Sequence, residues 1–148
     1  MSLDRVGVVA WRIHGGRLQV VLVRNLNGDR WILPKGRLTR GLSKREVALL
    51  EAWEEAGVSG YMSPRKGLDV QIQRMGCAVR LRLYEVRILG LAKRWPERDK
   101  RARKLVTARR ARSLLSDPGM ILAVKTLEQR MVRGGRRSAR FPGGDLST

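Results

Sequence analysis

The sequence contains one cysteine, Cys77, and one histidine, His14, among 148 residues. One cysteine excludes an intrachain disulfide and fits a reducing compartment, so we expect a cytoplasmic protein. The N-terminus lacks the plan of a signal peptide, and no apolar run approaches the roughly 20 residues of a membrane span. We therefore expect no membrane insertion. Cys77 falls in a strand-like run, where we expect it to be buried and inert, and His14 falls at a turn, where we assign it no role.

Acidic residues are also scarce, because 13 Asp and Glu oppose 32 Lys and Arg and leave a net charge of +19. Such a charge attracts polyanions, including nucleic acid, polyphosphate and highly phosphorylated small molecules. Arg far exceeds Lys, so the codon usage of a GC-rich genome is a second explanation. Charge thus predicts non-specific nucleic acid or polyphosphate binding without naming a partner, and nothing in the sequence indicates the oligomeric state.

Three of the scarce acids, Glu51, Glu54 and Glu55, lie close together in the sequence. A helix advances about 100° per residue, so these positions fall within one arc of about 100°. Three carboxylates on one face repel each other unless a hard divalent cation lies among them, and Mg²⁺ or Mn²⁺ prefers oxygen ligands. The alternative is an ordinary solvated face, and spacing alone leaves both interpretations open.

The residues around these glutamates predict a helix over 43–56. Ser43 and Glu46 have the spacing of a capping box, and Gly57 suits the C-terminal cap. The opposite face has the i, i+3, i+4, i+7 spacing of a core stripe, formed by Leu49, Ala52, Trp53 and Ala56. We therefore expect the apolar face to hold the helix against the core while the acidic face borders a cleft.

The rest of the chain predicts an α/β fold with a mixed sheet between helical layers. A hairpin with a Gly-bearing turn is predicted first, and the expected strands cover 5–13, 17–24, 31–33, 68–74 and 78–90. Two further helices are expected at about 107–116 and 119–132, and residues 91–105 are expected to form a basic loop. We predict one domain over residues 1–132, followed by a basic, flexible tail at 133–148.

The segment Gly36–Val58 resembles the Nudix box, the pattern G-x5-E-x7-R-E-U-x-E-E-x-G-U in which U is a bulky apolar residue. The preceding Trp31–Gly36, WILPKG, and the later Arg94–Glu97, RWPE, resemble the diphosphoinositol and diadenosine polyphosphate branch. The resemblance implies an α/β/α sandwich and a Mg²⁺- or Mn²⁺-dependent hydrolysis of a pyrophosphate bond in a phosphorylated small molecule. By position in the box, Glu51, Glu54 and Glu55 would be catalytic residues that hold the metal ions.

Two box positions depart from the family pattern, because Leu42 replaces a glutamate and Leu50 replaces an arginine. In the family these two side chains commonly pair and help orient the catalytic glutamates. An apolar pair can hold a fold as well as an ion pair can, so the departure concerns the orientation of Glu51 rather than the fold. The competing hypothesis is therefore a catalytically weakened Nudix module that binds RNA or another polyanion.

Four cations are candidate ligands for substrate phosphates. Lys35 lies in the WILPKG lead-in, next to the expected metal cleft, and strand arginines can line a sheet face, which adds Arg24, Arg80 and Arg82. For the arginines, an exposed face without a ligand is an equally good interpretation. Glu97 and Asp99 are weaker candidates for a general base outside the box, and a surface acid in a basic loop explains them better.

Overall fold

The structure, a computed structural model, describes residues 2–139. Its strands are β1 (Arg5–His14), β2 (Arg17–Arg24), β3 (Trp31–Ile32), β4 (Lys35–Arg37), β5 (Val58–Met62), β6 (Leu68–Arg74), β7 (Cys77–Leu91) and β8 (Arg103–Thr107). Its helices are α1 (Lys44–Ala56), α2 (Ala108–Leu114) and α3 (Pro118–Ala139). None of the described helices is both long and apolar enough to span a membrane.

The strands form one mixed sheet, which confirms the predicted fold class. The main path runs β3-β2-β1-β7-β5, while β4 pairs with β1, β6 with β7 and β8 with β2. β1 and β7 are parallel, and the other strand pairs are antiparallel. The β1–β2 hairpin turns at Gly15 and Gly16, whose φ angles of 57° and 75° suit the two-residue turn that matches strand twist.

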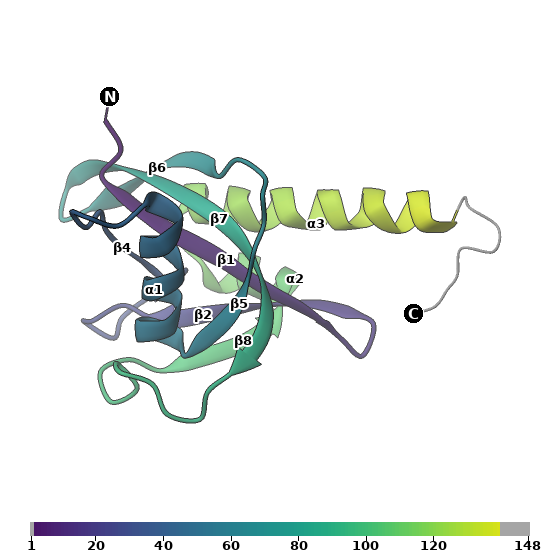
Figure 1. Cartoon of the computed structure of the whole chain (residues 1–148), viewed down its shortest axis with the longest axis horizontal. Coiled ribbons are helices and arrows are strands. Elements are labelled where there is room, and N and C mark those ends of the chain that lie inside the picture. The colour runs from purple at the N-terminus through teal and green to yellow at the C-terminus, as the bar shows by residue number, and fades with distance from the viewer. Residues whose placement is uncertain (1, 140–148) are drawn as a thin grey trace.

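Helices cover both faces of this sheet, with α1 on one face and α2 and α3 on the other (Figure 1). A strand that is covered on both faces buries consecutive side chains instead of alternate ones. The run Val20–Val23 in β2 follows this rule, because all four of its residues are fully buried. The core therefore lies on both sides of β1 and β2, and α1 is held against these strands from one side.

Three short strands were not predicted. Residues 103–107 belong to the stretch expected to be a basic loop, yet they form β8 and pair with residues 19–23 of β2. The charges of Arg103 and Lys104 are typical of a loop, so the local sequence did not indicate a strand. The strand is ordered by its pairing with β2, which lies about 80 residues away in the sequence. β4 and β5 were also missed, because β4 has three residues and β5 has five, which is too few for a clear sequence pattern.

Three other expectations need correction. Trp53 was assigned to the core, but it is 40% exposed, because the buried face of α1 is rotated toward Ala48, Ala52 and Ala56. Cys77 is exposed rather than buried, because it follows the tight β6–β7 turn. The tail was expected from residue 133, whereas α3 continues to Ala139; residues 140–148 lie outside the described part of the chain.

Candidate active site

Helix α1 is fixed at its start by its own sequence, as predicted. The side chain of Ser43 accepts from the backbone N–H of Glu46 at 3.1 Å, and the Glu46 carboxylate accepts from the N–H of Ser43 at 2.8 Å. These two bonds satisfy helix-end groups that would otherwise lack partners. Gly57 ends the helix with φ 64°, a left-handed conformation that glycine adopts without strain.

The other end of α1 is held by the segment between β7 and β8, which is distant in sequence. Three backbone carbonyls in the last turn of α1 accept hydrogen bonds from this region. The backbone N–H of Glu97 donates to the Glu54 carbonyl (2.9 Å), and Trp95 Nε1 donates to the Glu55 carbonyl (3.0 Å). Arg103 Nη1, at the start of β8, donates to the Ala56 carbonyl (2.9 Å). The Arg103 guanidinium also stacks 4.1 Å from the centre of the Trp95 ring. The turn that carries the glutamates is therefore anchored by a loop, and Trp95 has a packing role.

Glu51 and Glu55 place their carboxylates at the wall of a cavity of about 740 Å³. Gly36 lies directly behind Glu51, because a Cβ atom there would come within 2.2 Å of the Glu51 carboxylate. Glycine at this position thus lets the glutamate approach the β4 backbone. Glu55 is the only charged residue in the buried set of the described chain, with 4% of its surface exposed.

The Glu51 and Glu55 carboxyl groups lie close enough for a side-chain hydrogen bond between them. Burial and this hydrogen bond together raise the pKa of Glu55 to about 8. Burial also raises the pKa of Glu51, although the hydrogen bond from Glu55 partly opposes this. Two adjacent carboxylates in a poorly solvated site cannot both ionise easily. The raised pKa of Glu55 therefore favours a proton on the pair near neutral pH, and a neighbouring positive charge would favour its ionised form.

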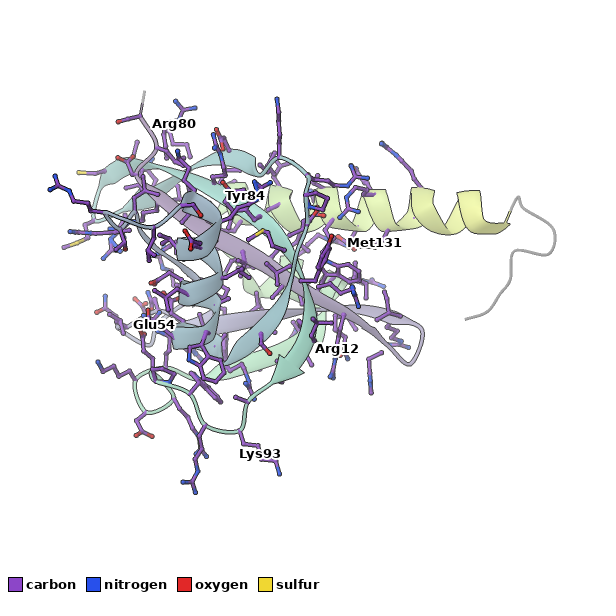
Figure 2. The ribbon with its side chains drawn as sticks, viewed as in Figure 1. Arg12, Glu54, Arg80, Tyr84, Lys93 and Met131 are labelled. Carbon is purple, nitrogen blue, oxygen red and sulfur yellow. The ribbon has the colours of Figure 1, made fainter. Side chains whose placement is uncertain are left out.

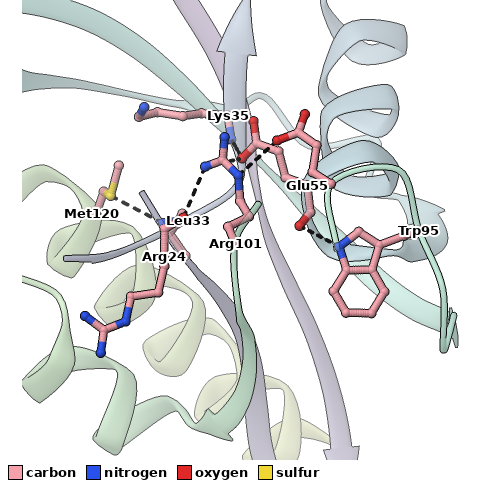
Figure 3. Close-up of polar contacts among 8 residues, drawn as sticks. Arg24, Leu33, Lys35, Glu55, Trp95, Arg101 and Met120 are labelled. Atoms are coloured by element: carbon pink, nitrogen blue, oxygen red, sulfur yellow. Dashed lines mark hydrogen bonds and ion pairs between the residues drawn. The ribbon is translucent and has the colours of Figure 1, made fainter. Parts of the chain in front are cut away.

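Arg101 places a positive charge beside the carboxylate pair from inside the protein (Figure 3). Its Nη1 lies 3.7 Å from Glu55 Oε1, and its Nε donates to Glu97 Oε1 at 3.0 Å. Nη1 also donates to the carbonyl of Arg24 at 3.2 Å, and only 8% of the Arg101 side chain is exposed. A buried guanidinium with two hydrogen-bond acceptors and an ion-pair partner is held in place and supplies a fixed positive charge beside the carboxylate pair.

Lys35 is the second cation at the pair. Its backbone N–H donates to Glu55 Oε1 at 3.3 Å, and the residue lines the cavity. Burial lowers the pKa of Lys35 to about 8; Glu55 opposes this shift, and nearby arginines add to it. A lysine with a pKa near neutrality that borders carboxylates and a cavity is a candidate functional residue.

The oxygen donors of this site suit a hard divalent cation, because a cation would replace the proton on the pair of Glu51 and Glu55. Glu54 is in the last turn of α1 (Figure 2) and lies close enough to Glu51 to raise its pKa, but it does not line the cavity. Within residues 2–139 no three His, Cys, Asp or Glu side chains form a ready cluster of metal ligands. The structure thus brings two of the three predicted ligands together at the cavity.

Among the four predicted phosphate ligands, Lys35 alone lines the cavity. The Arg24 guanidinium points away from Glu55 (Figure 3), stacks 4.5 Å from the Trp31 ring centre and donates to the Gly28 carbonyl. Arg82 forms a bidentate ion pair with Asp69 at 2.6 and 3.0 Å.

Arg80 also lies outside the cavity lining. It is near the N-terminal residues (Figure 2), and its backbone N–H donates to Asp4 at 2.8 Å. The side chains of Arg24 and Arg82 therefore contact other parts of the protein surface, and Lys35 remains the predicted cation that borders the carboxylates.

Several cavity residues were missed by sequence reasoning, namely Arg5, Arg37, Arg74, Lys100 and Arg101. Lys100 and Arg101 lay in the expected basic loop, where they were not distinguished from their neighbours. The remaining three come from three different strands. In a chain with 32 basic residues no local pattern marks them, because only strand pairing brings them together.

The two departures from the box occupy solvent-accessible positions. Leu42 and Leu50 are each 40% exposed. Neither side chain lines the cavity, so the replaced pair does not shape the space around Glu51 and Glu55. The carboxylates are positioned instead by Gly36 and by the loop that carries Arg101.

No protein-family model matches the chain. Nudix hydrolase 4 from Arabidopsis thaliana is 31% identical over 98 residues, which is 66% of this chain and 47% of that protein. The chain thus matches about half the length of this relative, and the sequence similarity includes a substantial part of the described fold.

Solved structures share the fold at low sequence identity. An Ap4A hydrolase from C. elegans has a TM-score of 0.73 and 15% identity, and the alignment covers 88% of this chain and 99% of that one. The Nudix domain of Shewanella oneidensis NrtR, solved with ADP ribose, has a TM-score of 0.66 and 19% identity, with coverage of 90% and 88%. These likenesses concern the arrangement of helices and strands.

Proposed function

We propose that the chain is a member of the Nudix hydrolase family and that it hydrolyses a pyrophosphate bond in a phosphorylated small molecule with the aid of Mg²⁺ or Mn²⁺. The observation that carries the proposal is the buried Glu55 carboxylate, paired with the half-buried Glu51, at the wall of a cavity that Lys35 and Arg101 also line. Substrates of the diadenosine polyphosphate or diphosphoinositol polyphosphate type suit this cavity best, because many of its lining residues are basic.

The chain's own residues have distinct roles in this proposal. Glu51 and Glu55 would hold the metal, with Glu54 adding negative charge from the adjacent position. A bound metal would polarise phosphorus, neutralise phosphate oxygens and lower the pKa of a water. Lys35 and Arg101 would neutralise charge that develops on the leaving phosphate, and the buried Arg101 would also limit how far Glu55 can move.

A catalytically weakened module that binds RNA or another polyanion is the second candidate, supported by the net charge of +19 and by Leu42 and Leu50 in place of the family pair. The carboxylate pair disfavours it, because buried like charges destabilise a protein that gains nothing from them. A pure polyanion binder would also be weakened by negative charge at the centre of its basic cavity.

The test is a hydrolysis panel with Mg²⁺ and Mn²⁺ over dinucleoside polyphosphates, diphosphoinositol phosphates, nucleotide sugars and nucleoside triphosphates. We expect release of a phosphate-bearing product from at least one class, with Glu51→Gln and Glu55→Gln lowering kcat far more than KM, because both groups act on the reacting phosphate. Arg17→Gln, an exposed substitution in the β1–β2 hairpin, is the control. Absence of turnover together with salt-sensitive RNA binding would favour the second candidate.

A further inference from the structure

Three arginines from three strands gather at the cavity that contains the carboxylate pair. Arg5 begins β1, Arg37 ends β4 and Arg74 ends β6, and all three line this cavity. Arg5 and Arg37 are direct cross-strand partners in the β1–β4 pair, so their side chains share one face of the sheet. We refer to Arg5, Arg37 and Arg74 as the tri-arginine cluster.

The β6–β7 hairpin delivers the third member of the cluster. Its two-residue turn consists of Met75 and Gly76, both with positive φ angles of 52° and 78°. Such a turn is tight and matches the twist of the flanking strands. Arg74 directly precedes this turn, so the hairpin holds the third guanidinium at the cavity although β6 is not a neighbour of β1 or β4 in the sheet.

The cluster carries charge that the protein does not neutralise. Burial lowers the pKa of Arg5, and the charges of Arg74 and Arg37 lower it further, while the charges of Asp4 and Glu51 act in the opposite direction. In the described part of the chain, no carboxylate forms an ion pair with any member of the cluster. Like charges placed directly opposite each other in a sheet destabilise it, so the cluster lowers stability unless an anion binds.

Two other partly buried arginines of the described chain have acidic partners, whereas Arg5 and Arg74 are also partly buried and have none, and Arg37 is exposed. Arg101 contacts Glu55 and Glu97, and Arg112 pairs with Glu128 at 2.6 Å. At the tri-arginine cluster the missing partner is most simply an anion from outside the chain, and three guanidinium groups suit phosphate oxygens.

We propose that the tri-arginine cluster binds substrate phosphates beyond the two that flank the bond broken at Glu51 and Glu55. This inference rests on the proposed function and adds to it a selectivity for substrates that carry three or more phosphates. A substrate with two phosphates, such as ADP ribose, would fill only the part of the cavity at Lys35 and Arg101. The additional phosphates could belong to a linear polyphosphate chain or to a ring that carries several phosphates.

The first test compares substrates in the double variant Arg37→Gln/Arg74→Gln. For P1,P4-di(adenosine) tetraphosphate we expect kcat/KM to fall by about a hundredfold, because each of the two lost charge-assisted contacts reduces binding by about tenfold. The loss for ADP ribose should be at least about tenfold smaller than the loss for the tetraphosphate. The same comparison is made with a diphosphoinositol polyphosphate. The substrate that shows the larger loss of kcat/KM identifies whether the cluster binds a linear polyphosphate chain or a phosphorylated ring. The control is Arg17→Gln/Arg110→Gln, two exposed arginines outside the cavity with the same change of charge.

The second test measures binding without turnover. In EDTA at fixed ionic strength, calorimetry should show that inorganic tripolyphosphate binds more tightly than pyrophosphate, and that the double variant loses this difference while the control pair keeps it. If hydrolysis occurs but the double variant lowers kcat/KM equally for all substrates, the cluster is not a phosphate site and the inference is overturned. If no substrate is hydrolysed, the proposed function fails, and equal binding of the two anions would then overturn the inference separately.

Discussion

The substitution Glu55→Gln tests whether the carboxylate pair holds a proton that a metal displaces. The pKa of Glu55 is raised by burial to about 8 in the folded protein, against an ordinary value of 4.5. Between these two values the folded state binds the proton and the unfolded state does not, so the stabilisation is complete below about pH 4.5 and is lost as pH rises toward 8. Glutamine resembles the protonated carboxyl and cannot lose a proton.

The expected magnitude follows from this linkage. One extra proton bound by the folded state changes the free energy of unfolding by up to about 1.4 kcal/mol for each pH unit. Urea unfolding in EDTA at pH 5.5, 6.5 and 7.5 should therefore show wild-type stability falling with pH, whereas Glu55→Gln should give a much flatter profile. Asp99→Asn is the control, because it also replaces a carboxylate by an amide, in an exposed residue that does not line the cavity.

Metal should reverse the loss at high pH. At pH 7.5, Mg²⁺ at ten times its dissociation constant should stabilise wild type by about 1.4 kcal/mol, since a ligand that binds only the folded state stabilises it by mass action. Glu55→Gln should respond less, and at pH 5.5 the wild-type response should shrink because protons compete with the metal. Parallel pH profiles for wild type and Glu55→Gln, with equal responses to Mg²⁺, would refute this reasoning.

Three further predictions concern the residues around the pair. Gly36→Ala should displace Glu51, because the added Cβ would meet its carboxylate at 2.2 Å; we expect reduced turnover and reduced Mg²⁺ stabilisation with a native circular dichroism spectrum, and unchanged values would contradict the packing described. Arg101→Met should lower the free energy of unfolding by about 3–5 kcal/mol in urea, because it leaves Glu55 without its buried partner; a loss no larger than that of Arg17→Met would count against this role. Leu42→Glu and Leu50→Arg should each change the free energy of unfolding by less than about 1 kcal/mol, since both positions are 40% exposed. The double variant should exceed wild-type turnover, because it restores the pair that orients the catalytic glutamates in the family. A double variant that is no faster than wild type would show that the missing pair does not limit turnover.

Local geometry explains which parts of the site could be predicted from sequence. The capping box at Ser43, the helix end at Gly57 and the common face of Glu51 and Glu55 depend on residues within a few positions of each other. Helix geometry converts that spacing directly into position, so the pattern was sufficient. The same holds for the β1–β2 hairpin, where two glycines supply the positive φ angles that the turn requires.

Long-range packing decided the rest. Whether Trp53 or Glu55 is buried depends on the rotation of α1 against the sheet, and the helical spacing alone was compatible with the wrong choice for Trp53. Arg101 reaches Glu55 across 46 positions because the loop between β7 and β8 caps the end of α1. The tri-arginine cluster exists only because β1, β4 and β6 end at one cavity. A chain with 32 basic residues contains many candidate phosphate ligands, and strand pairing together with the loop between β7 and β8 selects those that line the cavity.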